Sequence, residues 1–123
     1  MIGIDIVEIK RFEKFLEKKT ALQKYLSDEE ILLVTSPQTA AGFYASKEAI
    51  SKALGTGIGK TCSFKDIILH KDTSGAPYFT LSEHLIDTLG ITQSALSISH
   101  DGGFAIAVAV ITCKHENSKP LSH

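Results

Sequence analysis

The segment FYASKEAISKALGTGIG, residues 43–59, constrains the fold more than any other stretch of the chain. At about 100° per residue, Ala45, Ala49 and Ala53 fall on one face of a helix. Small residues at every fourth position let another element pack closely against that face. We therefore predict a helix over about residues 40–54, packed along its alanines and ended by the glycine-rich turn that follows.

A second alanine face occurs in FAIAVAVIT, residues 104–112. Ala105, Ala107 and Ala109 alternate there with larger side chains, and a period of two is typical of a β-strand. An alanine face on a strand lets a helix approach closely. With SALSISH, residues 94–100, this segment predicts a β-hairpin that turns at DGG.

The opening MIGIDIVEI, residues 1–9, also alternates and predicts a strand. Both of its faces are largely apolar, so we expect both to be buried, with Asp5 in the middle. An unpaired buried carboxylate is costly. Asp5 should therefore have a partner, which is a cation, a metal or several hydrogen-bond donors.

The other expected elements are short, and together they give the fold class. They are a helix with an apolar stripe at Ile9, Phe12, Phe15 and Leu16, a helix with a Ser27–Glu30 capping box, a chain break at Pro37, strands at 64–72 and 77–81, and a helix between Ser82 and Gly90. The sequence predicts an α+β fold in which an antiparallel sheet packs against one long helix and shorter helices. We expect a single domain over residues 1–113 and a polar, frayed tail over residues 114–123.

Composition excludes several classes of protein. The formal net charge of −1 gives no overall basic field for nucleic-acid binding. No apolar run approaches the ~20 residues of a membrane span, and the first ten residues lack the basic start of a signal peptide. Cys62 and Cys113 are too few for a disulfide scaffold, so reduced thiols in the cytoplasm are the simplest prediction. The basic run at residues 9–19 is either a solvated face or a docking face for an acidic partner.

Three groups of polar residues carry candidate chemistry. Glu48 and Lys52, four positions apart, form either an exposed ion pair of about 0.3–0.5 kcal/mol or one edge of a cleft beside the alanine strip. Asp5 and Glu48 could together hold Mg²⁺, which commonly takes two carboxylates plus waters and substrate phosphates, if the strand and the helix meet. His100, at the end of a strand, is either a surface residue or part of a site.

The turn GTGIGKT, residues 55–61, resembles a phosphate-binding P-loop but does not satisfy its pattern. Only three residues separate its first glycine from the Gly-Lys pair, and it follows a helix instead of a strand. It is either a helix cap and turn or a flexible backbone that approaches a phosphate or nucleotide closely.

Three stretches carry a family resemblance: residues 3–12 (GIDIVEIKRF), 43–59 and 97–111 (SISHDGGFAIAVAVI). They resemble the signatures of holo-[acyl-carrier-protein] synthase, the short bacterial type of 4′-phosphopantetheinyl transferase. Their order and spacing match from Ile2 to Ile111, with GAPYFTL in the expected place between the second and third signatures. The resemblance implies transfer of the 4′-phosphopantetheine arm of coenzyme A to a serine of apo acyl carrier protein, for fatty acid biosynthesis. Adenosine 3′,5′-bisphosphate would be the leaving group.

The resemblance also implies roles for individual residues. Asp5 and Glu48 would hold Mg²⁺ on the pyrophosphate, with Lys52 as a point charge beside it. His100 would be a general base for the serine or a phosphate contact, with metal-bound water as the competing base. The residues implied in coenzyme A binding are Tyr44, Lys52, Gly55, Thr56, Gly57, Ile58, Pro77 and His100.

The family is trimeric with active sites at subunit interfaces, so a homotrimer is implied. Arg11 matches a family arginine that meets the acidic carrier protein, which favours the docking interpretation of the basic run. Two departures stand in the second signature, where Phe43 replaces the usual arginine and Tyr44 the usual phenylalanine. TSPQTAA, residues 35–41, replaces a basic stretch, so no basic binding residue is carried over there.

Two other functions remain as alternatives. One is a non-catalytic coenzyme A or nucleotide-binding module on the same scaffold, against which the intact Asp5, Glu48 and Lys52 argue. The other is a structural oligomer whose charged helix is simply solvated, and three signatures in register argue against it. Metal-dependent turnover distinguishes the enzyme from both alternatives, and the structural oligomer alone predicts no metal-dependent ligand binding.

Overall fold

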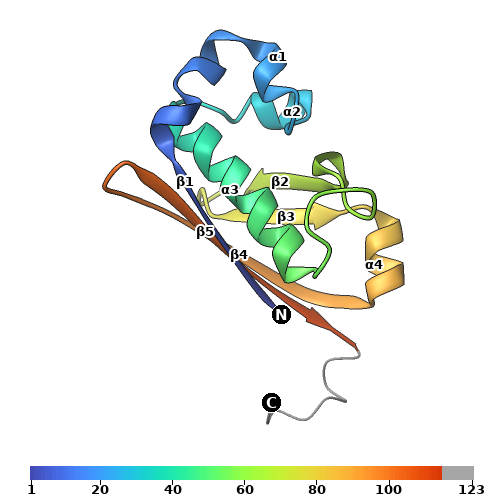
Figure 1. Ribbon diagram of the computed structural model, residues 1–123. Helices are drawn as coiled ribbons and strands as arrows, with labels where there is room; N and C mark the ends of the chain where they lie inside the picture. Colours follow the sequence, from blue (N-terminus) through green and yellow to red (C-terminus); the bar gives the residue numbers. More distant parts are fainter. Residues whose placement is uncertain (115–123) are drawn as a thin grey trace.

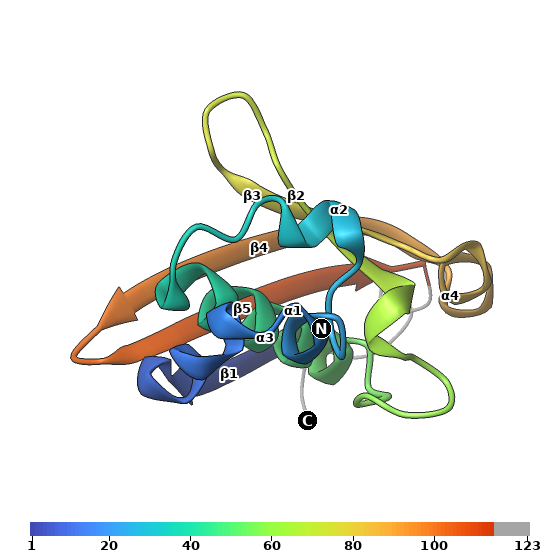
Figure 2. The ribbon, with the colours of Figure 1, turned by 90° about the horizontal axis from the view of Figure 1, so that it is seen from above.

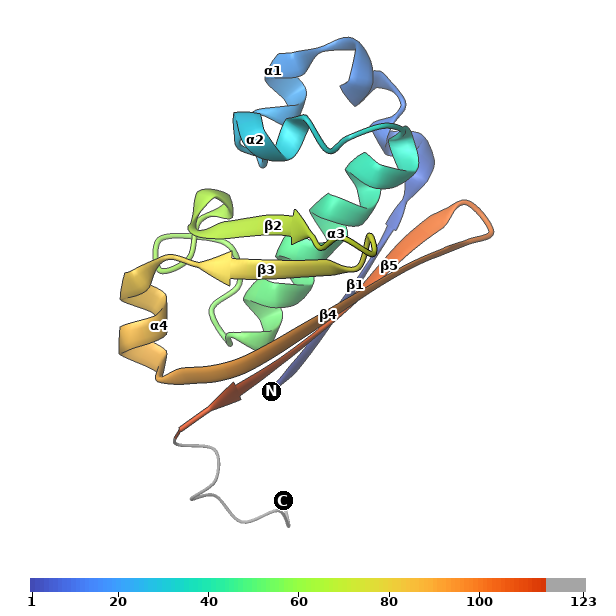
Figure 3. The ribbon, with the colours of Figure 1, turned by 180° about the vertical axis from the view of Figure 1, so that it is seen from behind.

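The computed structural model describes residues 1–114 and shows two antiparallel sheets beside one long helix, α3 (Figure 1). The three-stranded sheet has the order β1-β5-β4, and β2 pairs with β3 in a separate hairpin. Seen from above, α3 runs along the three-stranded sheet (Figure 2), and from behind the β2–β3 hairpin crosses α3 (Figure 3). The elements are β1 (Ile2–Glu8), η1 (Ile9–Phe12), η2 (Lys14–Glu17), α1 (Lys19–Leu22), α2 (Asp28–Ile31), α3 (Pro37–Ala53), η3 (Phe64–Asp66), β2 (Ile67–Lys71), β3 (Pro77–Leu81), α4 (Glu83–Leu89), β4 (Ile91–Asp101) and β5 (Phe104–Cys113).

The predicted α+β class and both predicted hairpins are confirmed, although the strands divide into two sheets. The capping box of α2 is also confirmed: Ser27 Oγ accepts from the Glu30 N–H, and Glu30 Oε1 accepts from the Ser27 N–H. No helix within residues 1–114 is both long and apolar enough to cross a bilayer. The division into one domain stays a prediction, and residues 115–123 of the expected tail lie outside the described residues.

Helix α3 begins three residues before the predicted start, and the expected chain break at Pro37 is wrong. Pro37 is the first residue of the helix, a position that proline tolerates because its missing N–H would have no intrahelical partner. Ser36 caps the helix, and its Oγ accepts from the Thr39 N–H at 3.2 Å. The C-terminal end agrees with the prediction, with Gly55 in the left-handed region at φ 80°.

The two predicted alanine faces meet between α3 and the sheet. The alanines that form this contact, all essentially fully buried, are Ala45, Ala49, Ala53, Ala105, Ala107 and Ala109. The approach is closest at Gly3 of β1, where a Cβ atom would lie 1.9 Å from the carbonyl oxygen of Ala49. At this contact the backbone of β1 packs directly against the backbone of α3.

The prediction that both faces of β1 are buried is wrong. Ile2, Ile4 and Ile6 are 72, 58 and 57% exposed, because α3 covers only the face that carries Gly3 and Val7. On the paired strand, Val110 and Phe104 are each 40% exposed. An apolar sheet face is therefore open on the single chain.

The predicted helix after β1 is wrong as one continuous helix. The chain instead forms two 3₁₀ turns, η1 and η2, before the short α1. Phe12 is buried and Phe15 partly so, whereas Leu16 is 39% exposed and outside the core. Turns of 3₁₀ helix shift the apolar residues off the 3.6-residue stripe on which the prediction rested.

Candidate active site

The first group of candidate residues meets where β1 crosses the C-terminal half of α3. Lys52 Nζ donates to Asp5 Oδ1 at 2.9 Å and to the carbonyl oxygen of Ile4 at 3.1 Å. The Asp5 side chain is 16% exposed and that of Lys52 51%. The sequence could not show that strand and helix meet here, and Asp5 has the cationic partner that its position required. Lys52 therefore pairs across elements with Asp5, not along the helix with Glu48.

Tyr44 links Glu48 to this group from one helical turn earlier. Burial raises the pKa of Tyr44, and the charge of the Glu48 carboxylate raises it further, with a smaller contribution from Asp5. Arg11 acts in the opposite direction, and its guanidinium lies 5.9 Å from the centre of the Tyr44 ring. Glu48, and more weakly Arg11 and Asp5, therefore act electrostatically on the Tyr44 hydroxyl.

The donor set suits a hard divalent cation. Asp5 and Lys52 line a hollow of about 230 Å³ whose walls are the apolar side chains of Ile4, Ile6 and Ile106. Within residues 1–114, no cluster of three or more His, Cys, Asp or Glu side chains could cage a metal with protein ligands alone. Mg²⁺ is commonly held by one or two carboxylates plus waters and substrate phosphates. Asp5 and Glu48 fit that requirement.

The glycine-rich turn follows the C-terminal end of α3 and begins at Gly55, three residues after Lys52. The backbone N–H groups of Thr56 and Gly57 donate to the carbonyl oxygen of Ser51 at 3.2 and 3.1 Å. Gly57 has φ 64°, and open space surrounds the positions where Cβ atoms would stand on Gly55 and Gly57. The turn is held at its base and open beyond it, so a ligand can come close to its backbone.

His100 and Pro77 lie together elsewhere, in a hollow of about 180 Å³ that is also lined by Gly42 and Phe43 of α3. The His100 Nε2 atom lies 3.2 Å from the carbonyl oxygen of Gln38, in the first turn of α3. His100 is exposed and also borders a larger hollow of about 490 Å³.

The single chain does not bring His100 and Pro77 to the Asp5–Lys52 group. The two groups line different hollows, the first beside Ile4, Ile6 and Ile106 and the second beside Gly42 and Phe43. In the sheet, β5 separates the strand of Asp5 from the strand of His100. The predicted site residues thus form two half-sites on one chain.

Sequence reasoning missed Lys47, which is fully buried in an ion pair with Glu30 at 2.9 Å. Burial lowers the pKa of Lys47, and the hydrogen bond and charge of Glu30 oppose that shift. A signal was present in the sequence. Lys47 stands four residues after Phe43 and three before Ile50, within the apolar stripe of α3.

Comparisons with known proteins agree with this architecture. The family model of the 4′-phosphopantetheinyl transferase superfamily matches residues 1–109. A holo-[acyl-carrier-protein] synthase of Nautilia profundicola is 54% identical over 113 residues, which are 90% of this chain and 98% of that protein. One of Wolinella succinogenes is 53% identical over 113 residues, 90% of this chain and 96% of that protein.

Solved structures give the same result. The crystal structure of Helicobacter pylori holo-[acyl-carrier-protein] synthase in complex with coenzyme A matches with a TM-score of 0.86 and 50% identity, over 91% of this chain and all of that one. A Bacillus anthracis holo-(acyl-carrier-protein) synthase matches with a TM-score of 0.77 and 37% identity, over 92% of this chain and 96% of that one. The chain belongs to the holo-[acyl-carrier-protein] synthase family, within the 4′-phosphopantetheinyl transferase superfamily.

Proposed function

We propose that this protein transfers the 4′-phosphopantetheine arm of coenzyme A to a serine of apo acyl carrier protein, releasing adenosine 3′,5′-bisphosphate. The observation that supports this most is the Asp5–Lys52 ion pair where β1 crosses α3, with Glu48 one helical turn before Lys52 on the same helix. Two carboxylates and an ammonium group on a half-buried surface suit a pyrophosphate with its metal. A non-catalytic coenzyme A-binding module would have little need for the carboxylate pair.

The reaction joins the serine oxygen to the β-phosphorus of coenzyme A and breaks the bond from that phosphorus to the bridging oxygen of the pyrophosphate. The serine proton passes to a general base, for which His100 is the side-chain candidate, and the bisphosphate leaves with the bridging oxygen. Mg²⁺, held by Asp5 and Glu48, would neutralise negative charge on the phosphate oxygens. Lys52, half exposed beside Asp5, adds a positive charge that the flexible side chain can direct at the leaving phosphate.

The open turn after α3 supplies the surface for the nucleotide. Its backbone from Gly55 to Ile58 is held to Ser51 and is not crowded above its glycines, so phosphate or ribose atoms can approach it. Tyr44 lies between this group and Arg11 and would form part of the same coenzyme A surface.

A homotrimer would complete the site. Because His100 and Pro77 line a different hollow from Asp5 and Lys52, we expect them to reach a pyrophosphate at Asp5 from a neighbouring copy. The open face that carries Ile2, Ile4 and Ile6 favours such association, since large exposed apolar patches mark protein interfaces. We assign His100 and Pro77 to the coenzyme A groove on this basis, and we place the reaction in the cytoplasm as a step that supplies holo carrier protein to fatty acid biosynthesis.

The mass of an apo acyl carrier protein tests the proposal directly. After incubation with this protein, coenzyme A and Mg²⁺, the carrier protein is expected to gain the mass of one phosphopantetheine arm. EDTA should abolish the gain, and added Mg²⁺ should restore it. Coenzyme A binding without any mass gain, over a panel of carrier proteins, would favour the non-catalytic module instead.

Arg11 is proposed to dock the carrier protein. Its guanidinium is exposed but rests over the rings of Phe12 and Tyr44, at 5.6 and 5.9 Å, which presents the charge at the edge of the site. Arg11→Glu is expected to raise the KM for the carrier protein about tenfold at low salt and to flatten its salt dependence. The KM for coenzyme A should change little.

The matched control is Lys114→Glu, which reverses an exposed charge beyond the end of β5. Both variants change the net charge by the same amount, so a general effect of charge would appear in both. An unchanged KM for the carrier protein in Arg11→Glu would remove Arg11 from the docking face.

A further inference from the structure

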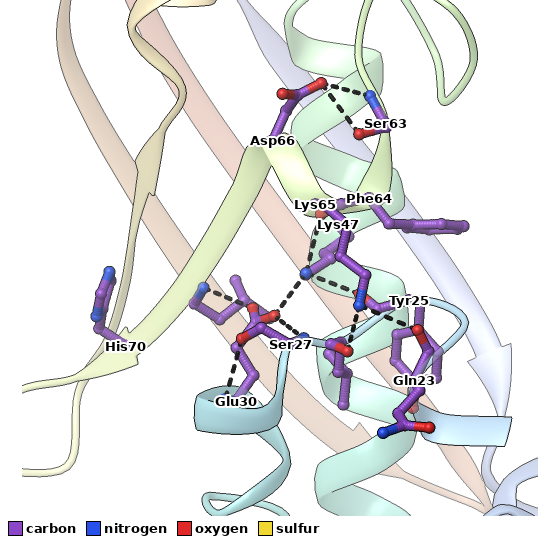
Figure 4. A network of polar contacts seen from close by, with 12 residues as sticks. Gln23, Tyr25, Ser27, Glu30, Lys47, Ser63, Phe64, Lys65, Asp66 and His70 are labelled. Carbon is purple, nitrogen blue, oxygen red and sulfur yellow. Dashed lines mark hydrogen bonds and ion pairs between the residues drawn. The ribbon is translucent and has the colours of Figure 1, made fainter. Parts of the chain in front are cut away.

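Lys47 lies at the centre of a buried polar network that the transfer reaction does not itself use (Figure 4). Its ammonium group donates to the carbonyl oxygen of Tyr25 at 2.8 Å, to Glu30 Oε1 at 2.9 Å and to the carbonyl oxygen of Phe64 at 3.0 Å. These partners use all three of its N–H donors. Both side chains of the ion pair are buried, with exposed fractions of 0% for Lys47 and 1% for Glu30.

Glu30 is equally well satisfied. Its Oε1 atom also accepts from the Ser27 N–H, and its Oε2 atom accepts from the Leu69 N–H, both at 2.8 Å. The pair therefore joins α2, α3, η3 and β2 (Figure 4). Within residues 1–114, no buried side-chain nitrogen or oxygen lacks a hydrogen-bond partner, so the network has little freedom to rearrange.

Hydrogen bonds from α3 hold both ends of the glycine-rich loop, residues 55–63. Lys47 and Ser51 are one helical turn apart on α3, and both are fully buried. Ser51 holds the first residues of the loop through the N–H groups of Thr56 and Gly57, and Lys47 holds Phe64, the first residue after the loop. Two neighbouring positions of one helix thus hold both ends of the segment proposed to contact the nucleotide.

Phe64 also contacts Tyr44, which lies one helical turn before Glu48 on α3. The Phe64 ring lies 5.7 Å from the Tyr44 ring, centre to centre. The carbonyl oxygen of Phe64 is the group that Lys47 holds, so the position of Lys47 bears on both the loop and one wall of the site. A glycine-rich loop samples many backbone conformations unless its ends are held, and ordering it on binding reduces affinity.

We propose that the buried Lys47–Glu30 ion pair is a positioning device that fixes the glycine-rich loop for coenzyme A. The proposal rests on the proposed function, since it assigns the loop to that substrate. The pair touches neither substrate nor metal, and its contribution is to make the loop rigid before coenzyme A arrives. It acts on coenzyme A affinity more than on the transfer step.

The test is the double variant Lys47→Met/Glu30→Gln, which removes both charges together and so leaves neither one buried alone. Its KM for coenzyme A, and its Kd by calorimetry, are expected to rise about tenfold. The kcat at saturating coenzyme A should stay within about threefold, and the KM for the carrier protein should not change, because Asp5, Glu48 and Arg11 are untouched.

The control for stability is Leu22→Ala, in the buried face of α1, which lies beyond the N-terminal end of α3, whereas the loop follows the C-terminal end of that helix (Figure 1). It should lower the melting temperature while leaving the KM for coenzyme A unchanged. If the double variant has a lower melting temperature but binds coenzyme A with wild-type affinity, the proposal is overturned and the ion pair is purely structural. If the double variant does not fold, Lys47→Gln/Glu30→Gln carries the test, because it also removes both charges but keeps hydrogen-bonding groups at both positions: a threefold higher KM for coenzyme A is expected, and an unchanged value overturns the proposal.

The wild-type protein in the same assays separates this proposal from the function on which it rests. Wild-type turnover with unchanged variant affinity contradicts only the role of the Lys47–Glu30 pair. Absence of turnover in the wild-type protein contradicts the proposed function, and calorimetry with coenzyme A then still measures whether the pair orders the loop for binding.

Discussion

Replacing Glu48 with glutamine is expected to lower kcat by about 10²–10³-fold while the protein remains folded. Glutamine keeps the size of the side chain and its contact with Tyr44, but its neutral amide is a much weaker ligand for Mg²⁺. The stabilisation of phosphate charge by a metal amounts to several kcal/mol, and each 1.36 kcal/mol is a factor of ten in rate. Circular dichroism and thermal melting should match the wild-type protein, because Glu48 is only half buried.

The measurement is the initial rate of carrier-protein modification across a titration of Mg²⁺. A partial recovery of the rate at high Mg²⁺ would identify the defect as one of metal affinity. Glu17→Gln, an exposed carboxylate on η2, is the control and should have wild-type kinetics. Near-normal activity of Glu48→Gln at low Mg²⁺ would show that Glu48 is not a metal ligand.

Gly3→Ala is expected to cause a large loss of stability. The new Cβ would stand 1.9 Å from the Ala49 carbonyl oxygen and 2.6 Å from the Ala53 backbone nitrogen. Both are backbone atoms of a helix and cannot move aside as a side chain can. Overpacking of this kind costs about 3 kcal/mol or more, which corresponds to a fall in melting temperature of about 10 °C or more.

Gly59→Ala is the matched control. It adds the same methyl group to a glycine with open space around it and no positive φ. Its melting temperature should stay within about 2 °C of the wild-type value. If Gly3→Ala and Gly59→Ala have the same melting temperature, β1 does not pack against α3 as closely as the structure shows. Activity should fall with Gly3→Ala as well, since displacement of β1 carries Asp5 away from Lys52.

The features that sequence predicted well are those set by neighbours along the chain. The capping box of α2 depends on Ser27 and Glu30, three residues apart, and the strand alternation of residues 104–112 depends on a period of two. The C-terminal end of α3 likewise follows from Gly55, which adopts a positive φ at little cost. Such local preferences act in the same way whatever the rest of the fold does.

The wrong predictions arose where local preference has more than one outcome. Pro37 begins a helix as readily as it ends one, and the choice depends on whether Ser36 is free to cap it. The burial of β1 depends on how many layers cover the sheet, which no period in residues 1–9 reveals. The stripe from Ile9 to Leu16 suits a helix, yet the chain there forms 3₁₀ turns around the buried Phe12.

By itself the sequence determined the α+β class, the alanine contact between helix and strand, and the residue types needed for phosphate chemistry. Only the tertiary structure decided which of those residues meet: Lys52 with Asp5 across 47 positions of sequence, and Lys47 with Glu30 across 17. The physical reason is that these pairs lie on different elements. Their distance is fixed by how closely β1, α2 and α3 pack, and that packing depends on contacts such as Gly3 against Ala49, which sequence spacing alone does not contain.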